Sequence, residues 1–159
     1  MKILGVFLIV LTIVSCGTTV GVEYDYETDF SNYKTYSYNP EIKSNLAPSD
    51  DELIIEITDR ILPTKSFVKS ETPQVYINFY VNEKTVLSKN TVTVGFIPIG
   101  KKVHSQEFNF ELIDASNDKI LWKAVAKDEL KRNASTSEKE KYYTGLLQEI
   151  LIKYPPKNK

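Results

Sequence analysis

The chain has 159 residues, of which 42% are hydrophobic and 26% are charged, and this suits one globular domain with a single core. Its 20 basic and 21 acidic residues give a formal net charge of −1, so the chain lacks the positive excess that nucleic-acid binding requires. Ten tyrosines and seven phenylalanines favour β-strands, because aromatic side chains pack well on a pleated surface. We therefore expect a β-rich domain that binds no nucleic acid.

An apolar segment opens the sequence. Lys2 is followed by "ILGVFLIVLTIV" (residues 3–14), and the small residue Ser15 stands before Cys16, the single cysteine. As a helix this segment rises about 18 Å, whereas a span of the bilayer needs about 20 residues. A positive start, a short apolar run and a small residue before the cleavage point are typical of a signal peptide. We expect residues 1–15 to be a signal peptide.

The tetrapeptide "IVSC" (residues 13–16) resembles the lipobox of bacterial lipoproteins. There the cysteine sulfur takes a diacylglyceryl group, the peptide is cut before the cysteine, and the new amine is acylated with a fatty acid such as palmitate. Cysteine suits this chemistry because its thiolate is a strong nucleophile near neutral pH. The alternative is an ordinary core cysteine in a buried N-terminal strand. Because each buried methylene adds about 0.8 kcal/mol, three acyl chains on Cys16 would hold the protein at a membrane.

Gly17 follows the cysteine, where a lipoprotein retained in the inner membrane of a Gram-negative cell would have aspartate. The sequence therefore predicts an outer-membrane lipoprotein that faces the periplasm. We expect residues 16–21 to be the lipidated cysteine with a short tether, and residues 22–159 to form the domain. With Cys16 acylated, no thiol remains for a disulfide, a metal site or catalysis.

Alternating apolar and polar residues predict several strands. Two lie near the start of the domain, at 22–26 and 33–38. A third covers "QVYINFYVN" (residues 74–82), with one face formed by Val75, Ile77, Phe79 and Val81. Two further runs flank residues 115–118 and predict a hairpin, because Asn117 and Asp118 tolerate turn conformations. Trp122 in that hairpin is predicted to be a core residue rather than a ligand platform.

Two segments have helical periodicity. The first, residues 48–63, places Ser49 and Glu52 at capping-box spacing and ends at Pro63. The second begins near Ser135 or Ser137, each with a glutamate three residues later, and stops at "PP" (residues 155–156). The predicted fold is α+β: a mostly antiparallel β-sheet with two helices packed on it, in a single domain after the signal peptide.

Three segments carry a resemblance to a known family: "YDYETDFSNYKTYSY", "FELIDASNDKILWKAVA" and "LLQEILIKYPP". Together they resemble the domain-of-unknown-function 4136 family of bacterial lipoproteins over essentially the whole mature chain. The most specific matches are Asp29-Phe30, Tyr33, Thr35-Tyr36, Asp114, Trp122 and Tyr154-Pro155-Pro156. The chain departs in having Asn117-Asp118 for a usual Thr-Gly turn, and Ala124 for a glycine. The resemblance implies a secreted, lipid-anchored α+β domain and brings no established catalytic residues.

Candidate chemistry is sparse. "GFIPIGKK" (residues 95–102) nearly matches a phosphate-binding loop, but Lys102 replaces the hydroxyl residue, Pro98 lacks an amide donor, and a strand pattern follows. We expect a plain loop or hairpin tip and no nucleotide. His104 is the single histidine, so a multi-histidine metal site is excluded and a surface position is expected. No cofactor is predicted.

Two groups of carboxylates have alternative interpretations. Asp50, Asp51 and Glu52 are a candidate cation site, but acidic residues in a first helical turn are explained by the helix dipole. Glu23, Asp25, Glu27 and Asp29 alternate along the first strand. Paired carboxylates can hydrolyse glycosides, although a solvated strand face is the simpler interpretation. The tyrosines are a candidate carbohydrate platform, but cross-strand packing is expected for most of them.

The segment 83–103 is the least regular part of the chain. It places apolar residues beside basic ones, which suits a partner protein or an anionic membrane: Phe96, Ile97, Ile99, Lys101 and Lys102. The alternative is that this segment folds back onto the sheet and completes the core.

The function that these features predict is that of a non-catalytic lipoprotein, anchored in the membrane through the acyl chains on Cys16, with a binding or structural role towards an envelope protein. The alternatives are an envelope hydrolase that uses carboxylates, and a domain that binds a lipid or other amphiphile between the sheet and the helices.

Overall fold

A computed structural model of the chain describes residues 19–87, 92–94, 97–99, 102–128 and 134–156. For residues 84–87, 92–94, 97–99, 102–105 and 128 it describes the backbone alone. The elements in chain order are β1 (Thr19–Tyr24), η1 (Phe30–Asn32), β2 (Thr35–Tyr38), α1 (Pro48–Ile61), η2 (Leu62–Lys65), β3 (Val68–Lys69), β4 (Val75–Leu87), β5 (Val92–Val94), β6 (Ile97–Ile99), β7 (Lys102–Asp114), β8 (Ile120–Asp128) and α2 (Thr136–Leu151).

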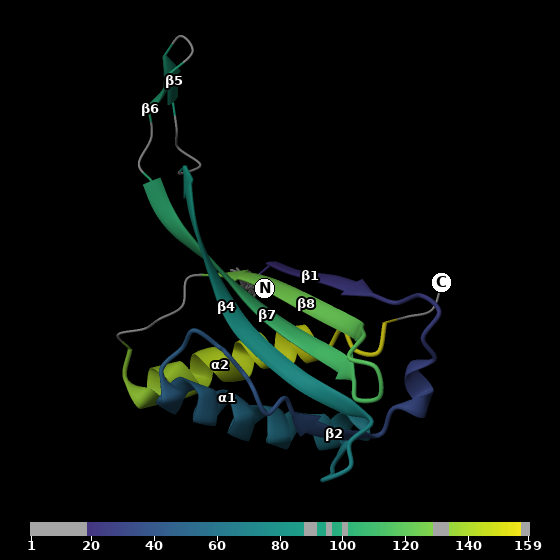
Figure 1. Ribbon diagram of the computed structural model, residues 1–159. Coiled ribbons are helices and arrows are strands. Elements are labelled where there is room, and N and C mark those ends of the chain that lie inside the picture. The colour runs from purple at the N-terminus through teal and green to yellow at the C-terminus, as the bar shows by residue number, and fades with distance from the viewer. Residues whose placement is uncertain (1–18, 88–91, 95–96, 100–101, 129–133, 157–159) are drawn as a thin grey trace, which may run out of the picture.

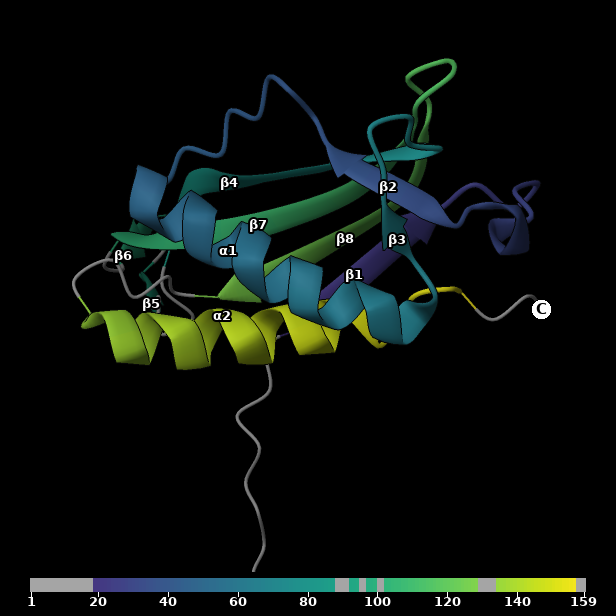
Figure 2. The same cartoon turned by 90° about the horizontal axis from the view of Figure 1, so that it is seen from below.

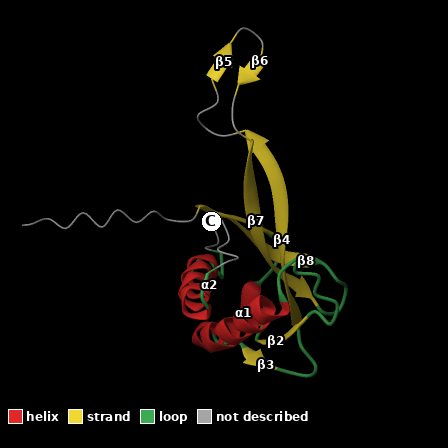
Figure 3. Ribbon diagram, turned by 90° about the vertical axis from the view of Figure 1, so that its left-hand side faces the viewer, coloured by secondary structure: helices red, strands yellow, loops and turns green. Residues whose placement is uncertain are grey.

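Six of these strands form one sheet in the order β1-β8-β7-β4-β2-β3, and both helices cover one of its faces (Figures 1 and 3). Within this order, β1, β8, β7 and β4 pair antiparallel with their neighbours, whereas β2 runs parallel to both β4 and β3. The predicted α+β class, with a mostly antiparallel sheet and two helices, is confirmed. β1 begins at Thr19, three residues before the predicted start of the domain at Val22.

The core lies between the sheet and the helices. The predicted face of β4 is buried, with Val75, Ile77, Phe79 and Val81 at most 1% exposed, and Trp122 is fully buried. From the helices, the fully buried apolar side chains include Ile54, Leu147, Ile150 and Leu151. Because buried side chains from both layers meet here, the space in which the sequence suggested an amphiphile is filled by the protein's own core.

The two helix starts differ in how they are capped. At α2, the hydroxyl of Ser135 accepts from the Glu138 amide, and the Glu138 carboxylate accepts from the Ser135 amide, so the capping box is confirmed. At α1, the predicted capping box of Ser49 and Glu52 is wrong. Ala47 is the N-cap without a side-chain bond, and Pro48 opens the helix, because proline's fixed φ already suits the first helical position.

The hairpin between β7 and β8 forms as predicted. Its turn places Asp118 at a φ of 58°, a left-handed conformation that aspartate tolerates better than most residues. The Asp114 amide donates to the Lys119 carbonyl oxygen across the turn at 2.8 Å, so the turn closes without a glycine.

β4 and β7 continue past the rest of the sheet as a two-stranded arm. They pair from Val75 and Asp114 out to Leu87 and Lys102, whereas β8 accompanies β7 only as far as Gln106. We call 84–87 with 102–105 the arm. At its far end β5 and β6 pair with each other as a separate sheet (Figures 1 and 3).

The arm and the start of β1 lie at the same end of the sheet. Thr19 pairs with Lys127, Lys127 with Glu107, and Glu107 in turn with Asn82. The arm therefore begins two residues beyond the row in which β1 begins. In the part of the chain that the structure describes, no helix has the length and apolarity needed to cross a membrane.

Candidate functional site

The predicted site residues fall partly outside the structure. Outside the described residues lie Cys16, Phe96 and Lys101. Ile97 and Ile99 belong to β6 and Lys102 begins β7, and for these three the backbone alone is described. The fold-back alternative requires this segment to lie on the six-stranded sheet. The backbone of β5 and β6 does not lie there (Figure 3). The proposed partner or membrane contact stays a prediction.

The acidic start of α1 makes a contact that the sequence did not predict. Asp50 is buried, and the Lys139 ammonium donates to both of its carboxylate oxygens, at 2.8 and 3.2 Å. This ion pair joins the first turn of α1 to α2. Among the described residues, no group of three metal-ligating side chains is placed to hold an ion. Asp50 therefore acts as an interhelical contact, in addition to its favourable place near the helix dipole.

The carboxylates after β1 serve local turns. Asp25 accepts from Lys119 Nζ at 2.8 Å and from Thr28 Oγ1 at 2.7 Å. These hydrogen bonds, with that from Lys119 the largest influence, lower the pKa of Asp25 to about 2. Asp29 caps η1 by accepting from the Ser31 amide and hydroxyl. The two carboxylates therefore fasten turns and do not face each other across a cleft.

The sheet face opposite the helices is polar, and one buried carboxylate lies at its centre. Glu111 accepts from Tyr80 at 2.9 Å and from Asn78 at 3.0 Å, and its oxygen lies 2.9 Å from Lys123 Nζ. Its side chain is 5% exposed. Burying a carboxylate is unfavourable unless it is paired and hydrogen-bonded, so this network stabilises Glu111 across three strands.

A shallow depression of about 410 Å³ on that face is bordered by two other glutamates, Glu23 on β1 and Glu107 on β7. They pair with Lys123 and Lys127 of the strand between them, so strand spacings place their Cα atoms about 16 Å apart. Catalytic carboxyl pairs of glycosidases lie about 5–9.5 Å apart, so both glutamate side chains would have to extend towards each other, whereas the Glu107 carboxylate lies 3.7 Å from Lys127 Nζ. The open face therefore gives the hydrolase alternative little support.

An Asp59 cluster fastens β2 to α1. The hydroxyls of Tyr36 and Tyr38 both donate to Asp59 Oδ1, at 2.8 and 2.7 Å, and Lys69 Nζ donates to Oδ2 at 2.8 Å. Burial raises the pKa of the Asp59 carboxyl, but these three hydrogen bonds together outweigh burial and lower the pKa. With every donor satisfied inside the cluster, we interpret it as structural.

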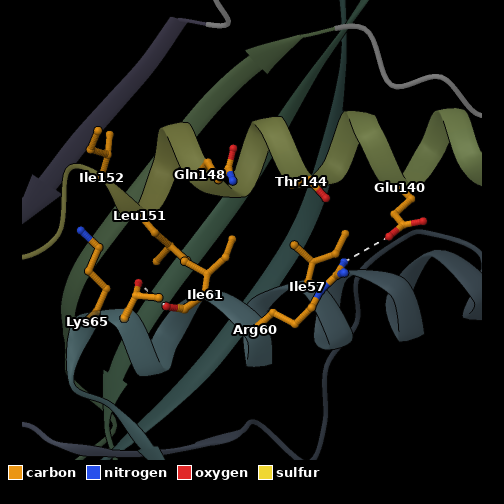
Figure 4. Close-up of a pocket in the computed structure, with 10 residues that line it drawn as sticks. Ile57, Arg60, Ile61, Lys65, Glu140, Thr144, Gln148, Leu151 and Ile152 are labelled. Carbon is orange, nitrogen blue, oxygen red and sulfur yellow. Dashed lines mark hydrogen bonds and ion pairs between the residues drawn. The ribbon is translucent and has the colours of Figure 1, made fainter.

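A groove of about 750 Å³ lies between α1 and α2 (Figure 4). Its apolar lining is formed by Ile57, Ile61, Leu151 and Ile152. Ile152 is 76% exposed, although it follows directly after buried Leu151. The groove lies between the two helices and not, as the sequence suggested, between the helices and the sheet.

Charged residues border the apolar lining of this groove. Arg60 Nη2 lies 3.3 Å from Glu140 Oε1, spanning the two helices (Figure 4). Lys65 Nζ donates to the carbonyl oxygen of Tyr154 at 3.3 Å. An apolar surface with cations at its margins suits an anionic amphiphile better than a neutral one.

A second, smaller pocket of about 290 Å³ is lined by residues of η1, of η2 and of the chain after α2. The chain after α2 runs at one end of the sheet (Figure 2). We call this pocket the end pocket. Its lining includes Phe30 and Tyr33 from the η1 region, Phe67 after η2, and the segment from Tyr154 to Pro156. The Tyr154 ring packs against Phe30, Phe67 and Trp122, with centroids 5.5–5.6 Å away. These contacts hold the ring in one orientation.

Comparison with known families decides the chain's membership. The model of the family described as "Domain of unknown function (DUF4136)" matches residues 20–156. The chain belongs to this family. The match confirms the resemblance that the sequence motifs carry, and it spans the domain from β1 to the end of the described residues. No curated protein matches this DUF4136 chain.

Solved structures share the DUF4136 fold at low sequence identity. A PDZ domain protein from Parabacteroides distasonis is 15% identical with a TM-score of 0.61, over 87% of this chain and 35% of that protein. The PelC dodecamer from Paraburkholderia phytofirmans is 16% identical with a TM-score of 0.50, over 85% of this chain and 96% of that one. This chain thus spans about a third of the PDZ domain protein's length. At these identities the two likenesses show the fold alone.

Most of the residues that carry the DUF4136 resemblance meet around the end pocket. Asp29, Phe30, Tyr33 and the segment 154–156 line it. Tyr33 donates to Asp114 at 2.9 Å, and Trp122 packs on Tyr154. The sequence singled these positions out as motifs but did not place them together, because they lie up to 127 residues apart along the chain.

Proposed function

We propose that this DUF4136 protein is a lipoprotein, anchored through acyl chains on Cys16 in the outer membrane and facing the periplasm, whose domain binds another envelope component without catalysing a reaction. The observation that carries this proposal is the "IVSC" motif, which ends three residues before β1 begins at Thr19. A lipobox suits this position, because removal of residues 1–15 would leave β1 and every later described element in place.

The short distance between anchor and fold supports a role close to the membrane. Only Gly17 and Thr18 separate Cys16 from β1, and two residues reach at most about 7 Å. Acylation would therefore hold the starting end of β1 near the lipid surface. The arm leaves the sheet at this same end, so its tip is the natural contact with a neighbouring protein or with the membrane, through Phe96, Ile97, Ile99, Lys101 and Lys102.

Cys16→Ala tests the anchor. In a Gram-negative host fed with labelled palmitate, the unmodified chain should carry the label and enter the detergent phase, and the variant should do neither. Ser15→Ala is the matched control, because alanine is also a small residue before the cleavage point and should preserve labelling. Label retained by the Cys16 variant would exclude lipidation at this cysteine.

A second candidate function, binding of an anionic amphiphile, is favoured by the groove between α1 and α2. Its apolar lining and bordering cations would accept an acyl chain and its headgroup. Ile61→Glu should weaken the binding of a fluorescent fatty acid at least about tenfold, because it introduces a charge into the apolar lining. Ile120→Glu is the control, because Ile120 lies on β8 outside the groove and is 46% exposed. Equal binding by both variants would argue against the groove as the amphiphile site.

A further inference from the structure

Tyr154 is a mostly buried phenol that lines the end pocket. Tyr154 is 4% exposed, its ring is held by three aromatic neighbours, and its hydroxyl makes no hydrogen bond to any residue that the structure describes. Burial is the main cause that raises the pKa of this phenol, so it stays protonated and offers a donor. The donor of this hydroxyl is therefore not used by the described protein, and the pocket is where an acceptor can approach it.

Two lysines add positive charge to the same pocket. Lys34 is exposed at its margin and has no ion pair within the described residues, while Lys65 is half-buried and donates to the Tyr154 carbonyl oxygen. Asp29 is the single carboxylate of the lining, and one of its oxygens is occupied by capping η1. The lining therefore has one more positive than negative group. A ligand for this pocket should bring negative charge.

The remaining walls are apolar and narrow. Phe30, Phe67 and two prolines enclose about 290 Å³, close to the lower limit of about 300 Å³ for small-molecule sites. This volume accommodates one ring or a short aliphatic group. Phosphate alone would leave these apolar walls without a contact, whereas a carboxylate attached to an apolar body would contact both the walls and the cations.

We propose that the end pocket binds a carboxylate carried on an apolar group about the size of one amino-acid side chain, with Tyr154 donating a hydrogen bond to it and Lys34 and Lys65 providing charge. The same chemistry occurs in a free carboxylic acid and at the C-terminus of a peptide ending in an apolar residue. The end pocket shares Lys65 with the groove between the helices and shares no residue with the arm, and the proposal does not rest on the function proposed for either.

The test compares an acid with its amide. The full chain in a non-ionic sugar detergent is titrated with 3-phenylpropionate and, separately, with 3-phenylpropionamide. Binding is followed by the fluorescence of Trp122, the single tryptophan, whose ring centroid lies 5.6 Å from that of Tyr154. The acid should bind at least about tenfold more tightly than the amide, because charge-assisted hydrogen bonds contribute about 1.5–3 kcal/mol. The amide also controls for partition into the micelles.

Variants assign the binding to the pocket. Tyr154→Phe keeps the ring and removes the hydroxyl, and it should weaken the binding of the acid about two- to tenfold. Lys34→Gln changes an exposed side chain and leaves the fold intact, and it should weaken binding and reduce its dependence on salt. Lys153→Gln, which alters an exposed lysine outside the pocket lining, should leave the affinity unchanged.

The two sources of the carboxylate are then separated with acetyl-Ala-Phe, as free acid and as C-terminal amide. Tighter binding of the free dipeptide than of 3-phenylpropionate identifies a peptide C-terminus as the ligand class, and weaker binding identifies a small acid. The proposal is overturned if no saturable change in Trp122 fluorescence occurs up to about 10 mM acid, a range that covers even weak ligands. It is equally overturned if acid and amide bind alike, or if Lys34→Gln and Lys153→Gln behave alike.

Discussion

Trp122 connects the sheet to the end pocket through its aromatic neighbours. Its indole is fully buried, lies edge-on to Tyr154 at 5.6 Å, and packs against Phe110 at 6.4 Å between centroids. Its Nε1 donor has no hydrogen-bond partner in the described structure. The residue therefore contributes through apolar burial and ring packing, and not through a polar contact.

Trp122→Ala should reduce the free energy of unfolding by roughly 3–5 kcal/mol, because the lost burial is accompanied by a cavity in a closely packed region. This is a large part of the 5–15 kcal/mol typical of a domain. Urea denaturation followed by far-ultraviolet circular dichroism measures the change. Ile120→Ala, two residues away on the same strand and 46% exposed, should cost much less. Similar losses for both variants would contradict a core role for Trp122.

At the scale of elements, the helix starts show what a local motif can predict. Both α1 and α2 carry serine and glutamate at capping-box spacing, but the side-chain bonds form only at Ser135 and Glu138. At α1 the helix already includes Ser49, because Pro48 supplies a favourable first position. The periodicity of the apolar residues predicted where both helices lie. The start of α1, however, is set by Pro48 and not by a serine cap.

The two serines therefore differ in their expected contribution. Ser135→Ala should lower the free energy of unfolding by about 1 kcal/mol, since it removes an acceptor for an amide that the helix itself leaves unpaired. Ser49→Ala should change stability by less than about 0.5 kcal/mol or increase it slightly, because alanine is favoured inside helices. Thermal melts of the two variants and the unmodified chain make the comparison. A larger loss at Ser49 would reverse the assignment of the caps.

At the scale of the whole molecule, the periodicity of apolar residues and the turn residues predicted the α+β fold class, the buried face of β4 and the β7–β8 hairpin. The strand order was not predictable, because β2 joins the sheet parallel to β4 and far from β1, its neighbour along the chain. The Asp50–Lys139 ion pair joins residues 89 apart, and the end pocket combines three distant segments. Such contacts depend on the packed topology, which leaves no local periodic signal in a single sequence.

The arm has a composition and a placement that neither local pattern nor core packing explains. Its strands pair beyond β8, and an isolated two-stranded hairpin is marginally stable in water. A contact with another surface would therefore stabilise it. We expect the tip to make this contact through Phe96, which lies between β5 and β6 in the sequence, and Ile97, the first residue of β6.

Replacing Phe96 and Ile97 together with serine tests that expectation in a chain that begins at residue 17 and so has no anchor. Melting should remain within a few degrees of the unmodified chain, since β5 and β6 form a sheet separate from the six-stranded one. Capture by anionic vesicles or by crosslinked envelope proteins should fall, because the apolar contacts that anchor such an interface are lost.

Phe108→Ala is the control for loss of a core side chain, because Phe108 lies in the buried face of β7. It should lower the melting temperature markedly through the cavity it leaves. A comparable loss of stability in the double variant would assign these side chains to the core, and unchanged melting together with unchanged capture would remove the tip as a contact site.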